Sequence, residues 1–319
     1  MVKTSSILCP IDFSEQSRHA LLWASTIAQH RGAGMTVLSV VEPLLAEAAA
    51  MRLGVDLTRD ETGPTLGEFV EATLPEHQRQ ASRVQMEVKV GDPAEVILQT
   101  GRRLNTGLIV MGTHGHGGFR KLLLGSTTEQ VLRRTEWPVL AVPRGAVTAP
   151  AVADPGVQLK KILLATDFRE SALAATRWAT DLASDINVPL VFAHVVDPVV
   201  VPAPWQALVA DFEDDRVASG RRMIGKVAAH FGHAHDQYVV SVGRPADTIA
   251  SLAAEYGVGL VVMGLANDSD AESRGPGSIA YRVLRIAPVA VVVVPGTTGQ
   301  PAGLPRQSEE GLVESSENA

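Results

Sequence analysis

The sequence predicts an α/β protein made of two similar domains, each a five-stranded parallel sheet with helices on both faces. The chain has 319 residues, which is about twice the ~150 of a typical globular domain. Short runs rich in Val, Ile and Leu alternate with segments of helical period. Blocks of sequence from the first half recur, in the same order, in the second half. Together these three observations predict a duplicated α/β domain.

Four blocks of sequence define the internal repeat. The first ends in Asp12-Phe13 and returns 155 residues later, where it ends in Asp167-Phe168. The next two blocks return 152 residues later, so the offset drifts by only three residues. Short apolar runs often match by chance, but four blocks in one order at nearly one spacing indicate duplication. The paired blocks are 7–13 with 162–168, 90–94 with 242–246, 108–112 with 260–264, and 138–143 with 288–293.

The apolar runs of the first repeat predict its five strands. These runs are apolar along their whole length rather than at alternate positions, as expected for a sheet that is covered on both faces. The second repeat shows the same order of runs. The predicted strands of the first repeat are 7–11, 35–41, 84–90, 107–111 and 139–142.

Helix signals lie between these runs. After the first strand, Ser14 is a suitable N-cap, and apolar residues in steps of three and four lead to a stop near Gly32. Pro93 suits the first turn of a later helix, because its missing N–H would have no partner there. Residues 129–134 are also helical in pattern. In the second repeat we expect helices near 171–184, 206–230 and 245–256.

The composition changes along the chain suggest where the domains end. We expect one domain over residues 1–144 and a second over 159–296. Residues 145–158 show neither a helical nor a strand period and are expected to form a linker. Residues 297–319 hold too little apolar surface to offset the entropy of ordering, so we expect a disordered tail.

Charge and composition argue against several classes of protein. The net charge is −7, and no Lys/Arg stripe is interleaved with aromatic residues, which argues against a nucleic-acid partner. No apolar stretch approaches the ~20 residues of a membrane helix, and the first apolar run stops at Asp12, too soon for a secretory signal. We therefore expect a cytoplasmic protein with no membrane partner. Cys9 is the only cysteine, so an internal disulfide is impossible, and no motif identifies a metal ligand.

Two strand ends carry the candidate functional residues. In an open parallel sheet, a ligand is expected outside the carboxyl ends of the strands, where the winding direction reverses. Asp12 follows the first predicted strand, and Gly112 opens a glycine-rich segment after the fourth. A fixed carboxylate there could accept hydrogen bonds from sugar hydroxyls. Asp12 could instead be a helix cap or a turn residue.

The segment after the fourth strand has the chemistry of a phosphate-binding loop. It holds five glycines between residues 112 and 125, which let backbone N–H groups point inward around an anion. A helix that starts at Ser126 would add its free amides and its positive end, and Arg120 and Lys121 would add charge. A flexible surface loop followed by a Ser cap is the alternative. Neither the P-loop nor the dinucleotide-binding spacing is present.

The spacing Gly112-x-x-Gly115, then nine residues, then Gly125-Ser126 resembles the nucleotide-binding motif of the universal stress protein family. The resemblance covers roughly residues 2–144 and 159–296. It implies the adenine nucleotide alpha hydrolase-like variant of the Rossmann-like fold, with sheet order 3-2-1-4-5 in each repeat. That order places the first and fourth strands side by side and brings Asp12 and Gly112 to one crevice.

The resemblance also implies an adenine-nucleotide ligand, ATP, with or without Mg²⁺. In the ATP-binding branch of the family, the residue matching Asp12 contacts the nucleoside, and Pro10 belongs to the same short motif, Pro10-Ile11-Asp12. Backbone groups that match Val40 meet the adenine. The positions that would hold the ribose and phosphates are Gly112, Gly115, Gly125, Ser126 and Thr127.

The equivalent loop of the second repeat departs from this pattern. Asn267 replaces the second glycine, and the loop from 264 to 277 carries one basic residue against three acidic ones. The first loop has a charge of +2 and the second 1 − 3 = −2, which would repel a triphosphate unless Mg²⁺ bridged the acids to the phosphates. We expect a weaker or empty second site. Its candidate residues are Asp167, Gly264, Gly277 and Ser278.

The resemblance favours a nucleotide-dependent regulator in a stress response over an enzyme. The sequence offers no obvious nucleophile beside an oriented base. Slow ATP hydrolysis or self-phosphorylation is an alternative, with Ser126 as the first candidate residue. A scaffold that binds no nucleotide is a third alternative. The apolar fifth strands, 139–142 and 289–294, are expected to invite edge pairing, as an intramolecular pseudo-dimer of the two repeats or as a homodimer.

Overall fold

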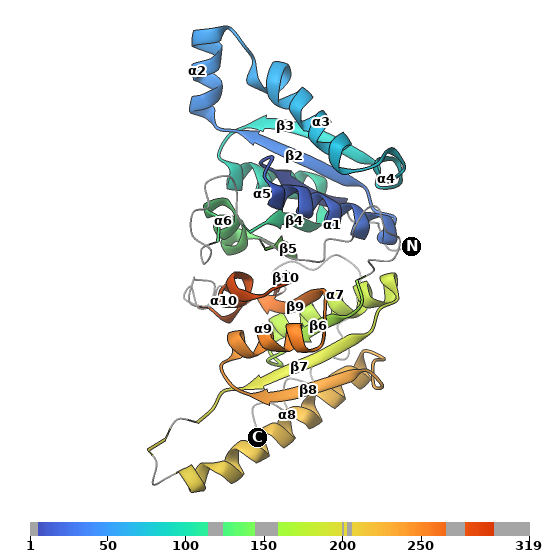
Figure 1. Cartoon of the computed structure of the whole chain (residues 1–319), viewed down its shortest axis with the longest axis vertical. Helices are drawn as coiled ribbons and strands as arrows, with labels where there is room; N and C mark the ends of the chain where they lie inside the picture. The colour runs from blue at the N-terminus through green and yellow to red at the C-terminus, as the bar shows by residue number, and fades with distance from the viewer. Residues whose placement is uncertain are drawn as a thin grey trace.

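The computed structural model describes residues 6–113, 124–143, 159–199, 201–202, 206–265 and 278–296, with side chains of 206–211 excepted. Ten strands form one sheet in the order β3-β2-β1-β4-β5-β10-β9-β6-β7-β8. Each half has the order 3-2-1-4-5, and the two halves lie one above the other in Figure 1. The predicted α/β class and strand order are therefore confirmed.

The first half contains five strands and the helices between them. The strands are β1 (Ser6–Ile11), β2 (Met35–Val41), β3 (Val84–Val90), β4 (Thr106–Gly112) and β5 (Val139–Val142). The helices are α1 (Glu15–Arg31), α2 (Pro43–Leu53), the π-helical turn η1 (Leu57–Thr62), α3 (Gly63–Thr73), α4 (Glu76–Ala81), α5 (Pro93–Leu104) and α6 (Ser126–Arg134).

The second half repeats the strand pattern with fewer helices among its described residues. Its strands are β6 (Ile162–Ala165), β7 (Leu190–Val196), β8 (Gln237–Val242), β9 (Leu260–Leu265) and β10 (Ala290–Pro295). Its helices are α7 (Glu170–Ile186), α8 (Gln206–His230), α9 (Pro245–Glu255) and α10 (Ile279–Ile286). The single long helix α8 stands where the first half has α2, η1, α3 and α4.

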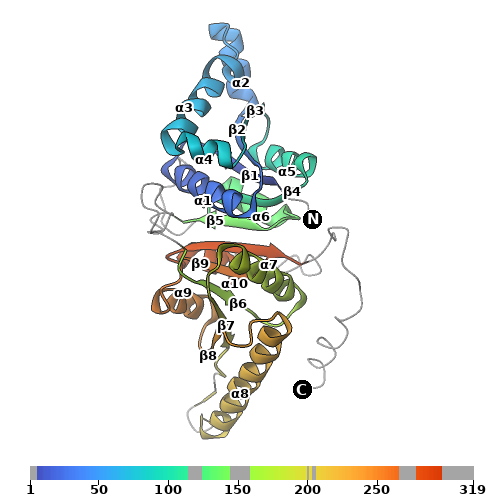
Figure 2. The same ribbon diagram turned by 90° about the vertical axis from the view of Figure 1, so that its right-hand side faces the viewer.

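Helices cover both faces of the sheet (Figure 2). Side chains of α1, α3, α7 and α8 form one apolar core with one set of strand residues. Side chains of α5, α6, α9 and α10 form a second core with the alternate strand residues. Successive strand residues point to opposite faces, so strands that are apolar throughout supply both cores. Each core runs through both halves of the chain.

Local signals begin and end the helices as predicted. Ser14 caps α1 by accepting a hydrogen bond from the Ser17 N–H, and Gly32 ends the helix in the left-handed conformation at φ 59°. Pro93 is the first residue of α5, and the Asp92 carboxylate caps this helix by accepting from the Glu95 N–H. The predicted limits of the five strands of the first repeat agree with the structure to within one residue. The limits of the helices predicted near 171–184, 206–230 and 245–256 agree to within two residues.

Two antiparallel strands join the halves. β5 pairs with β10 through Val139 with Val293, Leu140 with Val292, and Ala141 with Val291. The fifth strands therefore lie at the centre of the sheet, and β3 and β8 form its edges. The Arg31 guanidinium crosses between the halves, 3.0 Å from Asp185 Oδ2 and 5.1 Å from the centre of the Trp178 ring.

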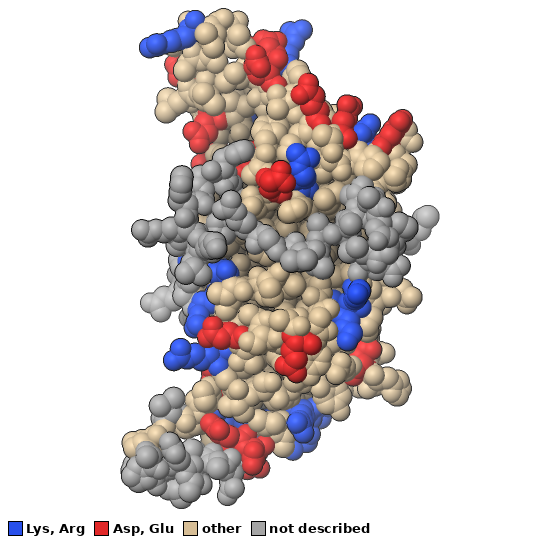
Figure 3. Space-filling view, in the orientation of Figure 1, with Lys and Arg blue, Asp and Glu red and all other residues tan. Residues whose placement is uncertain are grey.

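The surface of the described residues carries both signs of charge. On the face drawn in Figure 3, Lys and Arg side chains are interspersed with Asp and Glu. Among the described helices, none is both long and apolar enough to span a membrane. Cys9 lies fully buried in β1, and burial raises the pKa of its thiol. It packs in the core, as expected of a small apolar residue.

Candidate functional site

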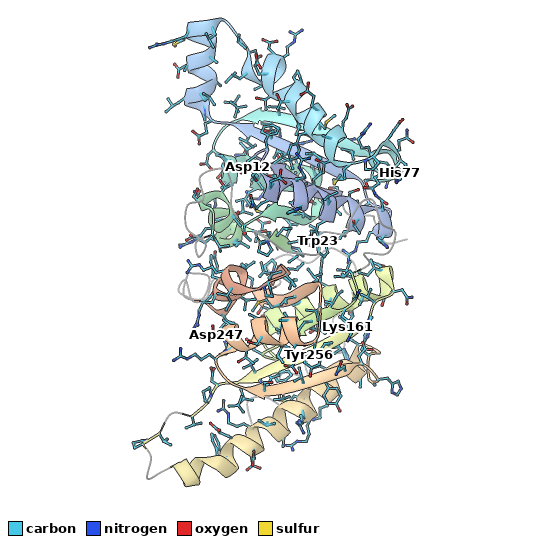
Figure 4. All side chains as sticks on the ribbon, viewed as in Figure 1. Asp12, Trp23, His77, Lys161, Asp247 and Tyr256 are labelled. Carbon is cyan, nitrogen blue, oxygen red and sulfur yellow. The ribbon has the colours of Figure 1, made fainter. Side chains whose placement is uncertain are left out.

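The parallel pairing of β1 with β4 brings two of the predicted site segments together. Leu8 of β1 lies opposite Ile109 of β4, so both strands reach the same edge of the sheet. Asp12 follows β1 directly, and Thr113 follows Gly112 at the end of β4. Figure 4 labels Asp12 in the upper half of the molecule, at the start of α1. The carboxylate and the start of the glycine-rich segment therefore lie at the same edge of the sheet.

The Asp12 carboxylate is exposed to solvent and held through one of its two oxygens. Oδ1 accepts hydrogen bonds from the Ser14 N–H (3.1 Å), the Ser14 hydroxyl (2.6 Å) and the Ser17 hydroxyl. Oδ2 has no hydrogen-bond partner among the described residues. Asp12 forms a turn with Ser14, which is one of the alternatives considered for this residue. The cap of α1 is Ser14, not Asp12.

The residue after Asp12 has an unusual backbone conformation. Phe13 has φ 64°, in the left-handed region that a bulky side chain rarely adopts. Its ring packs edge-on against Phe69 of α3 at 5.7 Å between centroids. Phe168, at the equivalent position of the second half, has φ 66°. The repeated Asp-Phe pair thus makes the same strained turn twice, and such strain is often found at functional sites.

The amino end of α6 lies at the same edge of the sheet, beside the carboxyl end of β4. Its N-cap residue is Gly125, which supplies no side-chain hydrogen bond. The N–H groups of the first turn therefore lack the side-chain cap that Ser14 gives α1. Ser126 is exposed and Thr127 is half-buried. This end of the helix, with its positive dipole, can bind an anion.

Hydrogen bonds hold the two ends of the glycine-rich segment against each other. The Gly125 N–H donates to the Thr113 carbonyl at 2.7 Å, and the Thr128 hydroxyl donates to the Gly112 carbonyl at 2.9 Å. The Thr113 N–H donates in turn to Val142 of β5 at 3.0 Å. These hydrogen bonds hold the carboxyl end of β4 beside the amino end of α6. Gly115 lies in 114–123, outside the described residues.

Four residues of this arrangement were not among the predicted site residues. They are Ser14 and Ser17, which bind Asp12, and Thr113 and Thr128, which join the ends of the segment. Ser14 was predicted only as a helix cap. The spacing of Ser14 and Ser17 after Asp12 is a signal that could have identified the pair, because hydroxyls three residues apart face the same side of a first helical turn.

The remaining predicted residues of the first half lie on the neighbouring strands. Pro10 is buried in β1, opposite Leu38 of β2. Val40 is half-buried near the end of β2, opposite Lys89 of β3. Because β2 pairs with β1, Val40 reaches the same sheet edge as Asp12.

The second half holds its aspartate differently. Asp167 is exposed at the end of β6, and Oδ1 accepts from the Arg169 N–H at 3.1 Å. Its Oδ2 lies 3.8 Å from the guanidinium of Arg169. Arg169 and Ala172 stand where the first half has Ser14 and Ser17, so both hydroxyls that bind Asp12 are lost. Asp167 faces a cation of its own chain instead.

Gly264 and Ser278 have structural roles in the second half. A Cβ on Gly264 would lie 2.7 Å from the backbone carbon of Ser171 and 2.8 Å from the Ala172 nitrogen, so close packing of β9 on α7 explains this glycine. Ser278 caps α10 by accepting from the Tyr281 N–H at 3.4 Å. This helix end is therefore capped, unlike that of α6. Gly277 lies outside the described residues.

The sequence matches the universal stress protein family twice, over residues 3–143 and 158–295. The chain belongs to the universal stress protein family. The two matches make it a tandem member with two domains, in agreement with the internal repeat.

Relatives of one and of two repeat lengths are similar to this universal stress protein. Universal stress protein Mb2028c of Mycobacterium bovis is 26% identical over 299 residues, which cover 91% of this chain and 97% of the relative. Universal stress protein MJ0577 of Methanocaldococcus jannaschii is 28% identical over 157 residues, which cover 45% of this chain and 97% of the relative. The first relative spans both repeats, and the second has the length of one.

A solved structure supports the fold of the whole chain. The crystal structure of a universal stress protein from Archaeoglobus fulgidus superimposes with a TM-score of 0.60 at 23% identity, and covers 93% of this chain and 98% of that one. At this level of identity, the likeness bears on the fold alone.

Proposed function

We propose that this universal stress protein binds ATP at the crevice between β1 and β4 and acts as a nucleotide-dependent regulator in a stress response. The observation that carries the proposal is that two groups lie at the same edge of the sheet. These groups are the Asp12 carboxylate, with Oδ2 free among the described residues, and the end of α6, which has no side-chain cap. Family membership supports the same assignment.

The two groups suit opposite ends of a nucleotide. Oδ2 of Asp12 would accept hydrogen bonds from the ribose hydroxyls, since an ionised carboxylate is an acceptor only. The first-turn N–H groups of α6, with the hydroxyls of Ser126 and Thr127, would meet the phosphates, with or without Mg²⁺. The backbone near Val40 would contact the adenine. Gly112 and Gly115 would contact the ribose and phosphates. Partner proteins would then distinguish the nucleotide-bound protein from the free protein.

The second domain would bind nucleotide weakly or not at all. Asp167 is paired with Arg169, α10 is already capped by Ser278, and the loop 264–277 carries a net negative charge. The negative loop would repel phosphate, and the ion pair and the serine cap leave the aspartate and the helix end less available to a nucleotide.

We also propose the domain limits and assembly that this function requires. One domain would occupy residues 1–144 and the other 159–296, with a linker at 145–158 and a tail at 297–319. The β5–β10 pairing supports a pseudo-dimer of domains within one chain. We expect the protein to act in the cytoplasm, where ATP is abundant. Because β5 and β10 already pair with each other, a homodimer would use a different surface, such as the edge strands β3 or β8.

Calorimetric titration with ATP of the intact chain and of matched aspartate variants tests the proposal. The wild type should bind one ATP per chain. Asp12→Asn should weaken binding by about ten- to a hundredfold, because a hydrogen bond to a charged acceptor contributes about 1.5–3 kcal/mol. Asp167→Asn, the same change in the second domain, should leave binding unchanged. No heat of binding in the wild type, or a loss confined to Asp167→Asn, would overturn the proposal.

A further inference from the structure

The hydrogen bonds around Asp12 are concentrated on one side of its carboxylate. All three donors reach Oδ1, and two of them are hydroxyls of buried residues, Ser14 and Ser17, which are 6% and 4% exposed. The aspartate itself is exposed. An exposed carboxylate without such donors would rotate freely about its side-chain bonds. The two hydroxyls therefore limit its orientation.

Ser17 contributes more to this arrangement than a single donor. Its hydroxyl accepts a hydrogen bond from the Asp12 N–H at 3.1 Å and donates one to Asp12 Oδ1. Its own N–H donates to the Ser14 hydroxyl at 3.2 Å. Ser17 thus binds both the backbone and the side chain of Asp12 and also orients Ser14. The left-handed turn at Phe13 brings these three residues together.

We propose that Ser17 is a positioning residue, which fixes the Asp12 carboxylate so that Oδ2 faces the sugar hydroxyls of a bound nucleotide. This inference rests on the proposed function and deepens it. Ser17 would not touch the ligand, because its hydroxyl is already engaged by Asp12. It would act by keeping Asp12 in the accepting orientation before the nucleotide arrives, which removes an ordering cost from binding.

The second domain is a natural comparison for the same position. Ala172 replaces Ser17, and Arg169 replaces Ser14. Asp167 keeps one backbone hydrogen bond and gains an ion pair with Arg169, whose side chain is 83% exposed. Asp167 follows its strand as Asp12 does, but no hydroxyl of the described residues fixes its oxygens and a cation lies beside them. Its position alone would therefore not make it a nucleotide ligand. This difference would make the first domain the stronger nucleotide binder.

Titration of the full chain with two nucleotides separates positioning from a merely structural role. Ser17→Ala should bind ATP about five- to tenfold more weakly than the wild type. It should bind 2′,3′-dideoxy-ATP as well as the wild type does, because this analogue lacks the hydroxyls that Asp12 would accept from. The wild type itself should bind the analogue more weakly than ATP.

Ser25→Ala is the matched control. Ser25 is also a buried serine of α1, 1% exposed, but its hydroxyl bonds Ser82 and lies two turns from Ser17. Thermal unfolding of both variants measures the general loss of stability. Ser25→Ala should bind both nucleotides as the wild type does.

Three further outcomes would decide against the positioning role alone or against both proposals. Equal affinity of Ser17→Ala and wild type for ATP would overturn the positioning role and leave the proposed function intact. So would an equal loss for ATP and for the dideoxy analogue, which would indicate a structural defect. If the wild type bound neither nucleotide, the proposed function would fall, and the positioning role with it.

Discussion

Asp12 shows how far a single residue could be predicted and where prediction stopped. Its place at the end of β1 followed from the repeat and from the apolar run before it. The left-handed backbone of Phe13 could not be predicted, because phenylalanine disfavours that conformation and nothing in the local sequence requires it. The spacing of Ser14 and Ser17 was visible in the sequence, but their contacts with Asp12 depend on that turn and were not predicted.

Gly264 gives a stability prediction at the scale of one residue. In Gly264→Ala, the new Cβ would meet the backbone of Ser171 and Ala172 at 2.7–2.8 Å, and backbone cannot move aside cheaply. We expect a loss of about 1–3 kcal/mol in the free energy of unfolding. Urea denaturation followed by circular dichroism measures it.

Gly225→Ala is the control for this substitution. Gly225 lies inside α8, and no atom lies within 4 Å of a Cβ built there. Alanine should raise stability by about 0.5–1 kcal/mol, since glycine is unfavourable in a helix interior. If both variants were equally stable, the close packing of β9 on α7 would not explain Gly264.

At the scale of elements, the strands could be predicted and several helices could not. Strands of a doubly covered sheet are apolar throughout, so their sequence is distinctive. Of the helices between β2 and β3, α3 does carry an apolar stripe at helical spacing, Leu66, Phe69 and Val70, whereas α2 does not. In α2 only Ala49 is buried, while Leu44, Leu45, Met51 and Leu53 are 60–79% exposed, so its apolar residues form no stripe that faces the core.

The amino end of α6 yields a prediction in which stability and binding change in opposite directions. Gly125 is the N-cap, with φ −61° and ψ 145°, a conformation open to any residue. Gly125→Asp should stabilise the protein by a few tenths of a kcal/mol through a new cap. It should also weaken ATP binding by about tenfold or more, because a negative charge would then face the phosphates.

Gly125→Ser is the control, since it adds a cap and a Cβ without the charge. Thermal unfolding and calorimetry on the three proteins give both quantities. Equal ATP affinity of Gly125→Asp and Gly125→Ser would contradict an anion site at this helix end.

At the scale of the whole molecule, two similar halves share one sheet but differ at their candidate sites. The β5–β10 pairing and the contact of Arg31 with Asp185 join the domains. Duplication and the charge difference between the two loops were evident in the sequence. The replacement of the serine pair by Arg169 and Ala172 is also present in the sequence, but its effect on the aspartate became visible only in the turns at Asp12 and Asp167.

A crystal structure of the intact protein with ATP would show whether the nucleotide binds where we propose. We expect one nucleotide per chain, at the carboxyl ends of β1 and β4. A sugar hydroxyl should lie within hydrogen-bonding distance of Asp12 Oδ2, and the phosphates should lie at the amino end of α6. The second domain should hold none. Nucleotide bound beside Asp167, or a first-domain crevice filled by the protein's own side chains, would contradict the account.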